Sequence, residues 1–197
     1  AINSPEQALD AYRAAGIEPH LSHDITAAAL ASLRRAFGVE YALTLWPEWV
    51  WAIDNLDKLV ENRGWPLPPA LHGKRFALHA GAHIGGRKGA PATREGIEAV
   101  AGMAHAAGWT ITPDGLHALV FSKGEIVRRL SVESIVRSAV TSTAILASCT
   151  PPSPVHTDDG WYTGDYGFRL AGRAVLPEPI HCSGAQASWR LTRARRP

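Results

Sequence analysis

The order of strand-like and helix-like segments constrains the fold of this chain more than any other feature of its sequence. Short apolar segments typical of strands are separated by helical patterns, or by loops in which many of the 14 prolines and 18 glycines lie. A doubly wound parallel sheet needs regular alternation of strand and helix, and this order lacks it. The sequence therefore predicts an α+β fold, with strands near residues 41–45, 58–63, 75–80, 140–148 and 167–175.

Residues 1–40 have a helical pattern without strands. Ser4 and Pro5 suit the start of one helix, which Gly16 ends. A second helix is predicted over residues 24–37, where apolar residues form one stripe and Gly38 follows. We expect residues 1–40 to be an N-terminal helical extension packed on the rest of the chain.

Two further helical regions are predicted beyond residue 45. Pro47 is compatible with a first helical turn, which favours a short helix over residues 48–55. Residues 91–139 have the character of a helical insertion, with one helix over about 93–107 and a less regular helical pattern over 125–137. A turn is expected at residues 113–115 between the two.

Charge and cysteine content indicate the setting of the protein. The formal net charge is only +2, but four arginines lie within the last eight residues, so residues 193–197 belong to a basic C-terminal tail. Cys149 and Cys182 form neither a CxxC motif nor a disulfide framework, which favours a reducing, cytoplasmic localisation. No apolar run approaches the roughly 20 residues that span a bilayer, so no membrane association is expected.

Four segments, in order, resemble the ASCH domain of the PUA-like superfamily. Residues 43–49 (LTLWPEW) resemble its opening strand and helix start, and residues 57–63 (DKLVENR) fit the K-x-x-E-x-R part of its G-x-K-x-x-E-x-R signature, without the glycine. Residues 74–80 (KRFALHA) resemble the next strand. Residues 161–168 (WYTGDYGF), followed by Pro179, Gly184 and Trp189, resemble the closing strands.

This resemblance implies both a fold and a function. The fold would be a PUA-like small β-barrel over residues 41–192, interrupted by the insertion at about 91–139. PUA-like domains bind RNA or modified nucleosides, so the expected partner is RNA or a modified nucleoside. The ligand would lie in a cleft between residues 58–65 and residues 161–167.

Lys58, Glu61 and Arg63 are the first candidates for the chemistry of that cleft. Strand alternation places Glu61 and Arg63 on one face, with Lys58 at the start of the strand. Such a set can hold a phosphate or a base edge, or it can tune a carboxylate and an amine for proton transfer. The alternative is a structural ion pair on a half-exposed strand. Lys58 and Glu61 are therefore the candidate catalytic residues.

Aromatic and polar side chains around the same segments are candidates for ligand binding. Aromatic rings in loops at a barrel mouth suit stacking on bases, worth about 1–3 kcal/mol per base, although Trp46 also fits a core or lid position. His79 and His83 are four residues apart, but Gly81 lies between them and no second pair follows, so we expect no metal and no cofactor. The candidate ligand-binding residues are Trp46, Asn62, Arg63, Trp65, His79, Trp161 and Tyr166.

Two other classes of function stay open from the sequence. Some small ASCH-type proteins are amidohydrolases that act on N4-acetylcytidine and others are reported as ribonucleases, so the resemblance also allows a hydrolase. Lys58 matches the lysine of those amidohydrolases, but Glu61 occupies the position of their threonine. The third possibility is a protein-interaction module, which a cleft filled by side chains such as Trp161 would favour.

Overall fold

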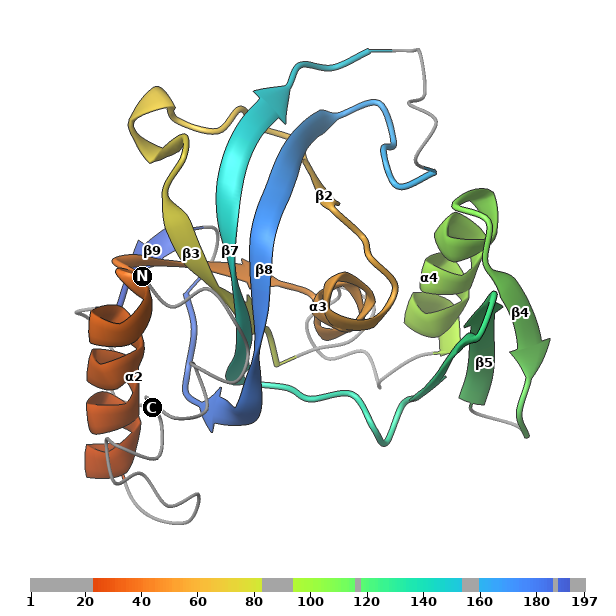
Figure 1. Cartoon of the computed structure of the whole chain (residues 1–197), viewed down its shortest axis with the longest axis horizontal. Helices are drawn as coiled ribbons and strands as arrows, with labels where there is room; N and C mark the ends of the chain where they lie inside the picture. The colour runs from red at the N-terminus through yellow and green to blue at the C-terminus, as the bar shows by residue number, and fades with distance from the viewer. Residues whose placement is uncertain (1–22, 83–93, 116–117, 154–159, 186–187, 192–197) are drawn as a thin grey trace.

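The structure is a computed structural model that describes residues 23–82, 94–115, 118–153, 160–185 and 188–191. Over these residues the fold is α+β, as predicted, with a main mixed sheet that curls into a half-barrel and a smaller sheet beside it (Figure 1). The strands of the main sheet are β1 (Tyr41–Leu45), β2 (Val60–Arg63), β3 (Arg75–Ala80), β7 (Ala139–Thr150), β8 (Tyr166–His181) and β9 (Ser188–Arg190).

The main sheet has the strand order β2-β8-β7-β3-β1-β9. Its only parallel pair among the described strands is β1 with β3, and the other neighbours are antiparallel. The pairing of the two longest strands, β7 and β8, shifts register at three places. Such irregularities bend and twist strands, and they account for the curl that β7 and β8 show in Figure 1.

The curl brings β2 close to β1, although three strands separate them in the sheet. Arg63 at the end of β2 donates a hydrogen bond from Nη2 to the carbonyl oxygen of Thr44 on β1, over 2.8 Å. A flat sheet would keep these strands far apart, since neighbouring strands are about 4.8 Å apart. The Arg63 side chain therefore connects β2 to β1, two strands that do not pair through their backbones.

Helix α2 (His23–Phe37) covers one end of the main sheet and confirms the helix predicted over residues 24–37. Ala29, Leu30 and Leu33 are buried against a cluster that includes Val140 of β7 and Leu176 of β8. These residues lie on the predicted apolar stripe. The helix predicted from Ser4 to Gly16 falls outside the described residues.

Helix α3 (Pro47–Asn55) has Pro47 in its first turn, as predicted, and lies between two cores. Val50 and Ile53 pack into the interior of the half-barrel with β1 and β3. Ala52 and Leu56 pack on the other side, in a cluster shared with α4 (Arg94–Ala106) and the smaller sheet. Figure 1 shows α3 between the curled sheet and α4.

The insertion is not as helical as its sequence pattern predicts. Helix α4 confirms the helix expected near residues 93–107, but three antiparallel strands follow it. The prediction of helix over residues 125–137 is wrong, because residues 126–131 form a strand that pairs with the strand over residues 118–123, from Lys123↔Ile126 to Ala118↔Ser131. Gly124 turns the chain with a φ of 59°, which closes a hairpin instead of starting a helix. The smaller sheet consists of β4 (Thr110–Pro113), β5 (Ala118–Lys123) and β6 (Ile126–Ser131).

Candidate functional site

Lys58 lies just before β2 and is only 1% exposed, although its side chain carries an amine. Its Nζ donates a hydrogen bond to the carbonyl oxygen of Val60 and lies 3.1 Å from Glu61 Oε2. The ring centre of Trp49, on α3, is 5.5 Å from the same nitrogen. A carboxylate, a carbonyl and an aromatic ring thus surround the amine.

Glu61 connects two cations through its two carboxylate oxygens. Oε2 contacts Lys58, and Oε1 lies 3.2 Å from Nε of Arg63. Its side chain is 9% exposed and that of Arg63 is 18% exposed, so water screens these pairs less than at the surface. The three candidates of this segment therefore form one charged row along β2, with the carboxylate between the two cations.

A chain of polar contacts runs from Arg63 through Thr44 on β1 to His79 on β3. The carbonyl of Thr44 accepts the hydrogen bond of Arg63, and its hydroxyl lies 3.2 Å from Nδ1 of His79. His79 Nε2 lies 3.0 Å from the carbonyl oxygen of Cys182. Because a carbonyl only accepts, Nε2 carries the proton, and Nδ1 accepts from the Thr44 hydroxyl. Burial lowers the pKa of His79 below its ordinary value of 6.5.

The lowered pKa of His79 predicts a loss of stability in acid. The folded protein keeps this ring neutral, whereas the unfolded chain binds a proton below about pH 6.5. The unfolded state therefore gains protons as the pH falls from 7 to 5, and the free energy of unfolding decreases. We expect His79→Gln to reduce this pH dependence in urea unfolding at pH 5, 6 and 7, while the exposed His105→Gln retains it. If the free energy of unfolding depended equally on pH in His79→Gln and His105→Gln, the prediction would be contradicted.

Aromatic residues form the accessible edge of this network. The Trp65 ring packs edge-on against Phe168 with centroids 5.1 Å apart, and the Arg63 guanidinium lies 5.9 Å from the Trp65 ring centre. Tyr166 is paired directly with Arg63 across β2 and β8, which places both side chains on one face of the sheet. Trp46, which follows β1, is 50% exposed. We call Trp46, Arg63, Trp65 and Tyr166 the aromatic rim.

Asn62 and Trp161 lie on the other face of β2. Strand alternation turns Asn62 away from Glu61 and Arg63. Its Nδ2 donates to the carbonyl oxygen of Trp161 over 2.8 Å, and its Oδ1 accepts from the backbone nitrogen of Thr163 over 3.1 Å. Trp161 itself is only 3% exposed. The structure therefore brings together Lys58, Glu61, Arg63, Trp65 and Tyr166, while Asn62 holds the segment that carries Trp161.

Asp57 directly precedes Lys58, and its backbone has a φ of 53°. This left-handed conformation favours glycine, although aspartate tolerates it better than most residues. Its Oδ1 lies 3.2 Å from Nη2 of Arg173 on β8. An aspartate at residue 57 is therefore compatible with the turn that leads into Lys58.

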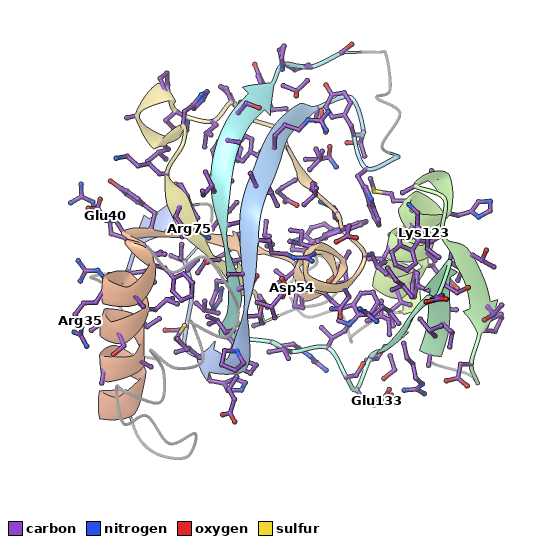
Figure 2. The ribbon with its side chains drawn as sticks, in the orientation of Figure 1. Arg35, Glu40, Asp54, Arg75, Lys123 and Glu133 are labelled. Carbon is purple, nitrogen blue, oxygen red and sulfur yellow. The ribbon has the colours of Figure 1, made fainter. Side chains whose placement is uncertain are left out.

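Thr44, Trp49 and Asp54 belong to the surroundings of the site but were not among the residues singled out in the sequence. Thr44 acts partly through a backbone carbonyl, which no side-chain pattern reveals. The position of the Trp49 ring beside the Lys58 amine depends on how α3 docks, which its local sequence does not reveal. Asp54 points from α3 towards β7 and β8 (Figure 2), accepts a hydrogen bond from Thr141, and burial raises its pKa.

Among the described residues, no group of three or more histidine, cysteine or acidic side chains is arranged to hold a metal ion. His79 is engaged by Thr44 and Cys182, and His83 falls outside the described residues. The described helices are all too short or too polar to cross a bilayer. A scan against protein-family models finds no match to the sequence, and a search of curated proteins finds no significant similarity.

Proposed function

We propose that this chain is an ASCH-type, PUA-like module that binds an unpaired RNA base or a modified nucleoside at the aromatic rim. The observation that supports the proposal most strongly is the position of Arg63. Glu61 and Thr44 fix its guanidinium beside the Trp65 ring, at the edge of a buried charged row. Sequence-specific RNA recognition mostly uses bases that are splayed out, stacked on aromatic rings and hydrogen-bonded at their edges.

Each residue of the site then has a distinct role. Trp46 and Trp65 provide ring faces for stacking, with Tyr166 beside them. A guanidinium has five N–H donors, and Glu61 and Thr44 take only part of that set, so Arg63 can donate to a base edge or a phosphate. Lys58 and Glu61 are buried, and Glu61, which contacts both cations, holds Arg63 in place.

Binding of nucleosides and short RNAs tests this proposal. We expect cytidine, N4-acetylcytidine or a short single-stranded RNA to quench tryptophan fluorescence saturably. Trp46→Ala should weaken the affinity by about 1–3 kcal/mol, the value of one lost stacking contact, because Trp46 is exposed and its removal leaves the core intact. Arg63→Gln should also weaken binding, whereas Lys74→Gln, an exposed change before β3, should not. No saturable binding by any of these ligands would refute the proposal and favour the protein-interaction module.

A hydrolase is the second candidate, and the contact between Lys58 and Glu61 favours it. An amine 3.1 Å from a carboxylate in a buried setting suits proton transfer, which amide hydrolysis requires. The same incubations, followed by chromatography, decide between the two functions. Deacetylation of N4-acetylcytidine or cleavage of RNA that Lys58→Met abolishes would make the protein an enzyme. Binding without turnover would make it a reader of RNA or of a nucleoside.

A further inference from the structure

A cavity of about 540 Å³ lies on the opposite side of the segment that carries Lys58. Asp57 and Leu59 line it, whereas Lys58 between them turns into the buried network described above. Its other walls come from β8 and from the insertion. The lining residues are Leu56, Asp57, Leu59, Ala107, Trp109, Lys123, Ile126, Trp161 and Arg169.

The cavity has the size and the opening that a small-molecule site needs. Ligand pockets in proteins measure roughly 300–1,000 Å³, and this volume falls well within that range. Leu59 and Ile126, which line it, are 45% and 41% exposed, so the cavity is open to solvent between them. A cavity between two substructures, with apolar walls and a few polar groups, is a common place for ligands.

The charges of the lining favour an anion. Lys123 and Arg169 contribute two cations, and Nε of Arg169 also donates to the Thr150 hydroxyl over 3.4 Å. Asp57 is the only acidic residue among the described residues of the lining, and it directs an oxygen to Arg173 at 3.2 Å. Within the described part of the chain, the contacts of the Lys123 amine are neutral. It donates to the carbonyl oxygen of Ala107 over 2.9 Å and lies 5.9 Å from the Trp109 ring centre. Figure 2 shows Lys123 beside α4, where the insertion faces the main sheet.

The rest of the wall suits an apolar group. Trp109 and Trp161 line the cavity but are each only 3% exposed, so they are firmly packed parts of its wall. Leu59 and Ile126 supply accessible aliphatic surface, and the buried Leu56 lies behind them. A ligand that combines an aromatic ring with a phosphate would match both the apolar walls and the two cations.

We propose that this cavity is a second site, which binds the phosphate and base of a nucleotide between the main sheet and the insertion. Its phosphate contacts Lys123 or Arg169, and its base packs on the exposed side chains of Leu59 and Ile126. The site is separate from the aromatic rim and does not depend on the function proposed for it. The nucleotide is either a free mononucleotide or the phosphorylated end of an RNA strand.

Calorimetric titration with uridine 5′-monophosphate tests the site, with uridine and inorganic phosphate as partial ligands. We expect saturable binding of the monophosphate, and a dissociation constant at least tenfold higher in Lys123→Gln or Arg169→Gln. The matched control is Arg128→Gln on β6, which removes the same charge from an exposed side chain whose contact is the carbonyl of Val127. This control should bind as the parent does. Thermal unfolding of all variants shows that they fold.

The outcomes separate this site from the rim. Absence of monophosphate binding, or equal affinity in the parent, Lys123→Gln and Arg169→Gln, would overturn the proposal. Weakening by Trp46→Ala but not by Lys123→Gln would place the nucleotide at the rim and would also overturn it. A 5′-phosphorylated tetranucleotide that binds more tightly than the monophosphate, with the same dependence on Lys123, would identify an RNA end as the ligand. Tighter binding of the monophosphate would identify the free nucleotide.

Discussion

Replacing Glu61 by glutamine should destabilise the protein by about 3–5 kcal/mol, the usual cost of breaking a buried ion pair by removing one partner. The carboxylate contacts both Lys58 and Arg63, so its loss removes a counter-charge that the two cations share. Glutamine keeps the shape, which excludes a cavity as the cause. Urea unfolding at pH 7 measures the effect. The exposed Glu178→Gln on β8 is the control, and its effect should stay within about 0.5 kcal/mol.

The companion variant Lys58→Met should cost less than Glu61→Gln. Glu61 then still has Arg63 at 3.2 Å, and methionine fills most of the space of the buried lysine stem. The double variant Lys58→Met/Glu61→Gln should be more stable than Glu61→Gln alone, because the buried amine is gone. A loss of less than about 1 kcal/mol in Glu61→Gln would contradict the view that this carboxylate holds the row together.

Gly160→Ala should destabilise the protein by about 2–4 kcal/mol, the sum of backbone strain and overpacking. Gly160 precedes Trp161 and has a φ of 70°, in the left-handed region. A Cβ atom there would lie 2.4 Å from the backbone nitrogen of Ala107, at the end of α4. Backbone atoms cannot move aside as a flexible side chain does, so the segment carrying Trp161 must move away from the insertion.

Gly124→Ala is the matched control for Gly160→Ala. Gly124 also has a positive φ, 59°, but nothing lies within 4 Å of an added Cβ. Its replacement should cost only the conformational strain, about 1 kcal/mol. Thermal or urea unfolding of both variants measures the difference. Equal losses of stability in Gly160→Ala and Gly124→Ala would show that the close contact with α4 contributes nothing to the effect of Gly160→Ala.

The strands that carry the site were predictable from sequence, but their extent was not. Residues 167–175 read as one strand, yet β8 runs from Tyr166 to His181 and includes Pro177 and Pro179. Proline interrupts a ladder only where its nitrogen would have to donate. The pairing of β7 with β8 passes from Val175 directly to Ile180, so both prolines lie where that ladder is interrupted.

The strand over residues 126–131 was missed for a related reason. Its first four residues are exposed, and only Leu130 and Ser131 are buried, so the strand lacks the alternation that identifies a half-buried strand. Its stability comes from pairing with β5 after the turn at Gly124. The prediction of a helix used only the spacing of apolar residues, whereas pairing with β5 makes these residues a strand.

The members of the charged row were recognisable, but their burial was not. Spacing along β2 correctly places Glu61 and Arg63 on one face and Asn62 on the other. The burial of Lys58 depends on Trp49, and the position of Arg63 depends on a carbonyl of β1 that only the curl of the sheet brings near. The cavity behind Lys58 depends on how the insertion packs against the main sheet. No local sequence pattern predicts that packing.

The indole N–H signals of the protein, assigned by single Trp→Phe substitutions, test the proposed ligand site directly during an NMR titration with N4-acetylcytidine. The rim predicts that the signals of Trp46 and Trp65 shift together and saturate at one dissociation constant, while the signal of Trp109, in the wall of the separate cavity, stays in place. Shifts confined to Trp109 and Trp161, or no shift at all, would contradict a nucleoside site at the rim.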